Sequence, residues 1–196
     1  MNKKVVLSIA GSDPSSGAGI QADLKSFSLL GLHGTTAITC ITSQNTQKVK
    51  TIYKLPVKII EQQIDILFED FNINAVKTGM LYDGEIIKCV VKKIIQYQLK
   101  PVVDPVMIAT SGDSLSQKEF VTSLKKNLLP KTLMLTANIP ESEKLTELKI
   151  NSIEDIKKNC KKLFSYGPKY VLIKGGHLTN KKAIDILYDG KEFYEY

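Results

Sequence analysis

Residues 5–19 read VVLSIAGSDPSSGAG and lead directly into a segment with apolar side chains at helical spacing. The apolar run Val5–Ala10 ends at Gly11, a pattern that predicts a buried β-strand. Gly31 then closes a helix whose apolar face is formed by Ile20, Leu24, Phe27 and Leu30. A strand that enters a helix through a glycine-rich loop is the first part of a βαβ unit, so this stretch predicts an α/β fold.

The same alternation of strand and helix signals continues along the chain. Further strands are predicted at 35–42, 75–78, 101–104, 132–136 and 170–174. Further helices are predicted at 57–71, 85–97, 119–129 and, capped by Ser152 with Asp155, up to Tyr166. At the end, Asp189-Gly190 predicts a hairpin between 183–188 and 191–196. We therefore expect one domain over residues 1–196, with a mainly parallel sheet covered by helices on both faces.

The composition favours a cytoplasmic globular protein. Apolar residues make up 43% and charged residues 24% of the 196 residues, as in ordinary soluble domains. No apolar run approaches the roughly 18 residues that a membrane helix needs, so no membrane partner is expected. Val5–Ala10 is too short for the apolar core of a signal peptide.

Charge and cysteine content exclude several classes of site. The net charge is +7, but all 27 basic residues are lysines, and arginine dominates direct base reading. The lysines are scattered rather than clustered, so we expect no nucleic-acid partner. The three cysteines are widely separated, without a C-x-x-C pair, which argues against a disulfide framework or a zinc site.

The loop Gly11–Gly19 is the first candidate ligand site. Its glycines allow close approach of the backbone, and N–H groups at a helix N-terminus favour anions or polar ligand atoms. No Lys-Ser or Lys-Thr follows the glycines, so this is not a Walker loop. Residues 17–22 fit the dinucleotide pattern G-x-G-x-x-A, but the acid expected about 20 residues later is absent. A plain tight turn explains the loop equally well.

Two more candidates follow later strands. Gln44 carries donors and an acceptor in one plane, which suits the edge of a heterocycle, although a turn amide bonded to its own backbone is the commoner arrangement. Met80 can pack on a flat ring or belong to the core.

Charged and amide side chains follow the strands nearer the C-terminus. Asp104 could support a magnesium shell, with helix capping as an equal alternative. Asn138 and Glu141 are three residues apart, a spacing that helix N-capping alone explains. Lys174, beside a glycine pair, is a possible phosphate contact. His33 and His177 are far apart and no hydrolase motif is present, so we expect neither to act as a base.

The order of these motifs is more specific than any one of them. AGSDPSSGAGIQADLKSFSLLG, SQNT, KTGML, VVDPVM, an SGD-containing stretch, TANIPE and IKGGH follow one another from about Val5 to Tyr188. Together they resemble the hydroxymethylpyrimidine/phosphomethylpyrimidine kinases of thiamine biosynthesis, in the ribokinase superfamily. The resemblance implies a three-layer α/β/α ribokinase-like fold, a homodimer, and phosphorylation of 4-amino-5-hydroxymethyl-2-methylpyrimidine and its monophosphate by ATP with Mg²⁺.

The resemblance also implies roles for individual residues. Gln44 would bind the pyrimidine, in a pocket shaped by Met80, Val106 and the loop from Gly11 to Gly19. Asp23 would approach the hydroxymethyl group. The magnesium and phosphate network would comprise Asp104, Asn138 and Glu141, with the metal on Asp104 and Glu141, and Lys174 would lie in the nucleotide site.

One family segment has no counterpart in these residues. Family members carry a Gly-x-Gly-Cys segment that forms an anion hole and supplies the catalytic cysteine, and none of the three cysteines here follows a Gly-x-Gly. We therefore assign no catalytic residue and expect the C-terminal part of the fold to be missing. Loss of one oxyanion contact costs about 10²–10³ in rate, so a shortened copy that binds pyrimidine with impaired turnover is one alternative. The other is a pyridoxal kinase, which shares the fold and the chemistry.

Overall fold

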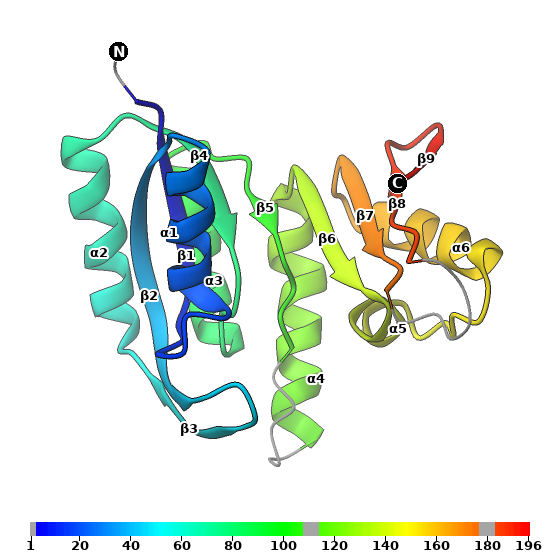
Figure 1. The fold of residues 1–196 in the computed structure, drawn as a ribbon, viewed down its shortest axis with the longest axis horizontal. Helices are drawn as coiled ribbons and strands as arrows, with labels where there is room; N and C mark the ends of the chain where they lie inside the picture. The colour runs from blue at the N-terminus through cyan, green and yellow to red at the C-terminus, as the bar shows by residue number, and fades with distance from the viewer. Residues whose placement is uncertain (1–2, 108–113, 177–182) are drawn as a thin grey trace.

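The strands of the molecule form one mixed sheet. The computed structural model describes residues 3–107, 114–176 and 183–196. Within them, nine strands lie in the order β3-β2-β1-β4-β5-β6-β7-β8-β9 (Figure 1). The neighbours from β2 to β7 are parallel, whereas β3, β8 and β9 join the sheet by antiparallel pairing. The mainly parallel sheet predicted from the sequence is therefore confirmed. The strands are β1 (Val5–Ser12), β2 (His33–Gln44), β3 (Val49–Lys54), β4 (Ile73–Thr78), β5 (Val102–Val103), β6 (Met134–Asn138), β7 (Tyr170–Lys174), β8 (Ile186–Tyr188) and β9 (Phe193–Glu195).

Helices lie on both faces of the sheet, but unequally. The helices are α1 (Gly19–Leu29), α2 (Val57–Asp70), α3 (Gly84–Gln96), α4 (Ser114–Ser123), α5 (Ile139–Thr146) and α6 (Ile153–Phe164). α1 packs on β1 and β2 and faces the viewer in Figure 1, whereas α3 and α4 lie behind the sheet. Buried side chains of α2, α3, α5 and α6 join those of the strands in one core cluster, to which α1 contributes none. The predicted layered α/β/α arrangement is thus present, with α1 alone on its face among the described helices.

Two elements were missed by the sequence analysis. β3 was not predicted because it is an outer strand with mostly exposed side chains, and its lysines interrupt the apolar pattern. α5 was recognised only through its N-cap, since a helix of eight residues offers too few turns for a clear apolar period.

One predicted helix has different bounds. The segment expected at 119–129 begins at Ser114, and the polar residues of this first part hide the period. It continues through a π-helical turn, Leu124–Leu128, into a 3-10 turn, Leu129–Lys131. Pro130 lies inside that last turn rather than after the helix.

Several local predictions are confirmed. Ser152 caps α6 by accepting the N–H of Asp155 at 3.2 Å, and β8 and β9 form the hairpin around Asp189-Gly190. The three cysteines are buried and free, in agreement with the absence of a disulfide framework expected from their spacing. Among the helices described, none combines the length and apolar character needed to cross a membrane.

Candidate active site

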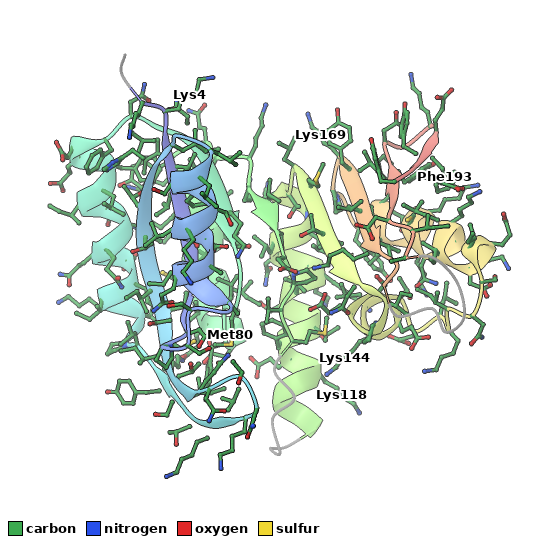
Figure 2. The ribbon with its side chains drawn as sticks, viewed as in Figure 1. Lys4, Met80, Lys118, Lys144, Lys169 and Phe193 are labelled. Carbon is green, nitrogen blue, oxygen red and sulfur yellow. The ribbon has the colours of Figure 1, made fainter. Side chains whose placement is uncertain are left out.

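A cavity lies at the carboxyl ends of the parallel strands. Its volume is about 770 Å³. It is lined by residues that follow β1, β4 and β5, by the N-terminal part of α1 and by the β2–β3 hairpin. Figure 2 shows Met80 at this lower edge of the sheet, near that hairpin. All six residues expected to contact a pyrimidine line this one cavity: Gly11, Gly19, Asp23, Gln44, Met80 and Val106.

The loop from Gly11 to Gly19 is organised by Asp13. This side chain is only 3% exposed, and one carboxylate oxygen accepts the N–H of Ser15 at 2.8 Å and its hydroxyl at 2.7 Å. The other oxygen accepts the N–H groups of Gly17 and Ala18 at 3.2 and 2.9 Å. Burial by itself would raise the pKa of Asp13, but these hydrogen bonds outweigh it and lower the pKa below the ordinary value. Three N–H groups of the loop, those of Ser15, Gly17 and Ala18, are therefore bound by the protein's own carboxylate.

Close contacts surround the glycines at both ends of this loop. Gly19 has φ +61°, and a Cβ there would lie 2.4 Å from the carbonyl oxygen of Gly11. A Cβ on Gly11 would lie 2.7 Å from Cε of Met80 and 2.9 Å from Sγ of Cys40. The segment is thus a tight turn, and its residues line the cavity.

Gln21 joins the start of α1 to the loop. Its Oε1 accepts the N–H of Asp13 at 2.9 Å, and its Nε2 donates to the Ser12 hydroxyl at 2.7 Å. The loop, the end of β1 and the first turn of α1 are therefore one hydrogen-bonded unit.

Asp23 projects from α1 into the same cavity and is held by two other elements. Lys77 of β4 donates to Oδ1 at 3.0 Å and to Oδ2 at 2.8 Å. The hydroxyl of Ser8, on β1, donates to Oδ2 at 2.5 Å. The side chains of Asp23 and Lys77 are 17% and 24% exposed, so this pair lies in the wall of the cavity rather than on the outer surface.

Gln44 lies at the end of β2 with its amide available. No hydrogen bond of this side chain occurs among the described residues, and the turn to β3 is made by Asn45, whose Oδ1 accepts the N–H groups of Gln47 and Lys48. The alternative of a turn amide therefore applies to Asn45 and not to Gln44. Opposite, the backbone carbonyl of Met80 accepts the Thr39 hydroxyl at 2.6 Å, which fixes the backbone where the Met80 side chain enters the cavity.

The remaining predicted residues gather beside the cavity, beyond β5. Asp104 lines it and accepts from Lys174 at 3.4 Å, so residues 70 positions apart meet there. Asn138 and Glu141 form a capping box at the start of α5, with both bonds at 2.8 Å. The capping explanation of these two residues is correct, and it leaves one carboxylate oxygen of Glu141 outside the box.

Glu141 is partly buried and lies near the charges of Asp104 and Lys174. Burial raises the pKa of Glu141 above its ordinary value, and the nearby charge of Asp104 adds to the effect. The N–H groups of Asn138 and Met107 and the Lys174 ammonium offset it only in part. No cluster of three or more metal-ligating side chains occurs in the described ranges. Two carboxylates nevertheless fit Mg²⁺, because this ion is commonly held by one or two carboxylates together with phosphates and water.

Sequence analysis missed three parts of the site. Asp13 carried a weak signal, since an aspartate before Pro-Ser-Ser-Gly is typical of a side-chain-stabilised turn. Lys77 gave no signal, because only the fold brings it to Asp23. The cavity wall from β3, residues 49–52, was missed with the strand itself. The SGD stretch at 111–113 and His177 lie outside the described residues.

Comparisons with known proteins identify the family that the chain resembles. A family profile described as phosphomethylpyrimidine kinase matches residues 13–196. The chain is 46% identical over 191 residues to the hydroxymethylpyrimidine/phosphomethylpyrimidine kinase of Bacillus subtilis, covering 96% of this chain and 70% of that protein. It is 42% identical over 192 residues to the thiamine biosynthesis bifunctional protein ThiED of Geobacter sulfurreducens, with 97% of this chain and 39% of that protein covered.

Solved structures give the same picture. The crystal structure of phosphomethylpyrimidine kinase from Clostridium difficile 630 matches with a TM-score of 0.89 at 46% identity, over 99% of this chain and 84% of that one. The pyridoxal kinase from Staphylococcus aureus, in complex with AMP-PCP and pyridoxal, matches with a TM-score of 0.89 at 38% identity, over 100% of this chain and 71% of that one.

Proposed function

Because the chain belongs to the phosphomethylpyrimidine kinase family, we propose that its cavity binds 4-amino-5-hydroxymethyl-2-methylpyrimidine and its monophosphate for phosphorylation by ATP. The single observation that carries the proposal is the convergence of all six expected pyrimidine contacts on one cavity, which Asp104 also lines. Lys174 and Glu141 lie next to Asp104, and we assign the nucleotide phosphates to this side of the cavity.

Different residues of the cavity bind different parts of the pyrimidine. The Gln44 amide offers donors and an acceptor to the edge of the pyrimidine, and Met80 and Val106 supply apolar contacts for its ring. Asp23 accepts a hydrogen bond from the hydroxymethyl group. These contacts orient the alcohol oxygen, and orientation is a large part of catalysis in phosphoryl transfer.

The charged residues act on the phosphates. The alcohol oxygen forms a bond to the γ-phosphorus, the bond from that phosphorus to ADP breaks, and the hydroxyl proton is released. Lys174 donates to phosphate oxygens. Asp104 and Glu141 would hold Mg²⁺, which neutralises phosphate charge. No group in the described part of the chain is assigned as the base.

Pyridoxal kinase activity is the second candidate. The same TM-score of 0.89 to a pyridoxal kinase in complex with pyridoxal supports it. A third candidate is binding of the pyrimidine without turnover, which the following assay distinguishes from the two kinases.

Release of ADP by the purified chain with Mg²⁺-ATP tests these candidates. We expect ADP with the pyrimidine alcohol or its monophosphate and less with pyridoxal. The reverse preference would favour the pyridoxal kinase. Binding of the pyrimidine by calorimetry, without ADP release from folded protein, would favour the third candidate.

A pair of glutamine variants tests the assignment of the cavity. Gln44→Ala should weaken binding of the pyrimidine about tenfold or more, because polar groups of the ring edge lose their partner. Gln47→Ala is the matched control, since Gln47 is exposed and does not line the cavity. Equal affinity of both variants would contradict the assignment of Gln44.

We also propose that the protein acts in the cytoplasm as a homodimer. The support is the resemblance, together with exposed apolar side chains on one side of the β2–β3 ribbon. Ile41 and Tyr53 are directly paired there, and they are 46% and 63% exposed. Sedimentation equilibrium should give twice the mass of the chain, and Tyr53→Glu should shift the protein to monomer.

A further inference from the structure

We propose that Lys77 is a positioning residue that, with Ser8, fixes Asp23 so that its carboxylate presents a single hydrogen-bond acceptor to the ligand. The inference rests on the proposed function for the identity of the ligand. It assigns a role to two residues that the motif order left without one.

The three side chains come from three different elements. Ser8 lies on β1, Asp23 on α1 and Lys77 on β4, so α1 is tied to two neighbouring strands at the cavity wall. Ser8 is fully buried and does not line the cavity, whereas Asp23 and Lys77 do. Ser8 therefore acts on a ligand only through Asp23.

The hydrogen-bond capacity of Asp23 is almost filled by the protein. A carboxylate has about four acceptor positions, two on each oxygen. Oδ2 accepts from Lys77 at 2.8 Å and from Ser8 at 2.5 Å, so both of its positions are used. Oδ1 accepts from Lys77 alone, at 3.0 Å. One acceptor position on Oδ1 is left, and it belongs to a residue that lines the cavity.

Small residues make room for this arrangement. A Cβ on Gly79 would lie 3.0 Å from the Lys77 ammonium and 3.0 Å from Cβ of Ala10. The lysine side chain therefore reaches Asp23 through a narrow space between residues that also line the cavity. This fit restricts where the ammonium can lie, and through it where the carboxylate lies.

A single fixed acceptor selects ligands with one donor at that point. The hydroxyl of a hydroxymethyl group meets this requirement, whereas a methyl group in its place would leave Oδ1 without a partner. An unpaired polar group in a closed site costs more than the missing bond alone. We therefore expect the site to discriminate against the analogue that lacks the hydroxyl.

The experiment compares two ligands in each variant by calorimetry. The ligands are 4-amino-5-hydroxymethyl-2-methylpyrimidine and 4-amino-2,5-dimethylpyrimidine, which differ only in the hydroxyl. In the wild-type chain the hydroxyl should improve affinity roughly 10- to 100-fold, the range for a hydrogen bond to a charged group. In Lys77→Met we expect this ratio to fall to about threefold or less, because the released carboxylate is no longer held at the ligand.

Two further variants separate positioning from stability. Lys54→Met is the matched control: Lys54 pairs with Asp83 and Glu85 at 2.5 Å, its side chain is 27% exposed, and it does not line the cavity. It should lower stability but leave the ratio unchanged. Ser8→Ala removes one hydroxyl from a buried position, so it should fold even where Lys77→Met does not. Its ratio should fall to a value between those of the wild type and Lys77→Met.

The outcomes are distinct. A wild-type chain that binds neither pyrimidine contradicts the proposed function. A wild-type chain that discriminates, with an unchanged ratio in Lys77→Met or, where that variant does not fold, in Ser8→Ala, overturns the inference alone. The monophosphate of the alcohol is measured as a third ligand. A selective loss of affinity for it in Lys77→Met, with the ratio retained, also overturns the inference, because Lys77 would then contact the phosphate directly.

Discussion

The two sides of the cavity are built differently. On one side, which we call the loop wall, the Asp13 carboxylate accepts three backbone N–H groups of the segment Gly11–Gly19 within 3.2 Å. On the other, which we call the phosphate wall, Asp104 meets Lys174 only at 3.4 Å, and Glu141 has a raised pKa. The loop wall is complete without a ligand, whereas the phosphate wall keeps charges that a ligand can satisfy.

This difference indicates which part of the ligand each wall binds. Groups that are already bound and packed hold a shape for a small, nearly neutral ring. Carboxylates and an ammonium with loose mutual contacts remain available for a metal and for phosphates. Substitutions in the loop wall should therefore reduce mainly stability, and those in the phosphate wall mainly binding of Mg²⁺-ATP.

The largest effect is expected at Gly19. Gly19→Ala should lower the free energy of unfolding by roughly 3 kcal/mol or more, since left-handed backbone and a clash with the Gly11 carbonyl add together. Gly31→Ala is the control: Gly31 has φ +73° but no atom within 4 Å of an added Cβ, so about 1 kcal/mol is expected. Both free energies of unfolding are measured with urea. An equal decrease in Gly19→Ala and Gly31→Ala would show that the loop wall is not tightly packed.

Asp13 should come next and should depend on pH. Asp13→Asn replaces an acceptor oxygen by a donor facing backbone N–H groups, at a cost of about 2–3 kcal/mol near neutral pH. Because the pKa of Asp13 is lowered in the folded protein, its contribution is present above the ordinary value of 3.8 and is lost as pH falls through the lower folded value. Unfolding curves of both proteins should therefore converge in acid. A difference in the free energy of unfolding between the two proteins that is the same at all pH values would contradict this account.

At the phosphate wall, Asn138→Ala should cost about 1 kcal/mol, the usual value of an N-cap. Ser152→Ala at α6 removes a comparable cap far from Asp104 and should cost the same. Only Asn138→Ala should also weaken binding of Mg²⁺-ATP, measured by calorimetry. Unchanged nucleotide affinity in both variants would limit Asn138 to capping.

The smallest stability effect is expected for Glu141→Gln. Glutamine keeps the capping acceptor, so the change in stability should stay below about 1 kcal/mol. Because the pKa of Glu141 is raised, its stabilising contribution is complete below its ordinary value of 4.5 and is lost as pH rises through the folded value. The glutamine variant should therefore be at least as stable as the wild type at neutral pH, with the difference closing in acid. A glutamine variant that is less stable than the wild type at neutral pH, but equally stable in acid, would contradict this expectation.

Much of the fold could be predicted from the sequence, because buried parallel strands and amphipathic helices each carry a clear period. β7, Tyr170–Lys174, has the predicted bounds, and α2 ends at Asp70, one residue before its predicted limit. β3 and α5 could not be found this way, since a solvated outer strand and a short capped helix lack that period.

The site was predicted as far as sequence order places residues at strand ends. Gln44, Met80 and Val106 follow strands that end at one edge of the sheet, so their common cavity could be anticipated. The pairing of Lys77 with Asp23 could not, because it depends on β4 lying beside β1 in the sheet order. Nor could the internal carboxylate of the loop, since Asp13 is equally compatible with a free ligand-binding acid.

The sheet has two outer strands, β3 and β9, and each leaves backbone N–H and C=O groups on one side without a strand partner in the described chain. Such borders can recruit strands of other molecules and start fibrils. β3 carries Lys50 and Lys54 between its apolar residues, and β9 has only three residues and ends at Glu195. Charge on one border and shortness on the other should keep concentrated solutions of the protein free of strand-to-strand aggregates.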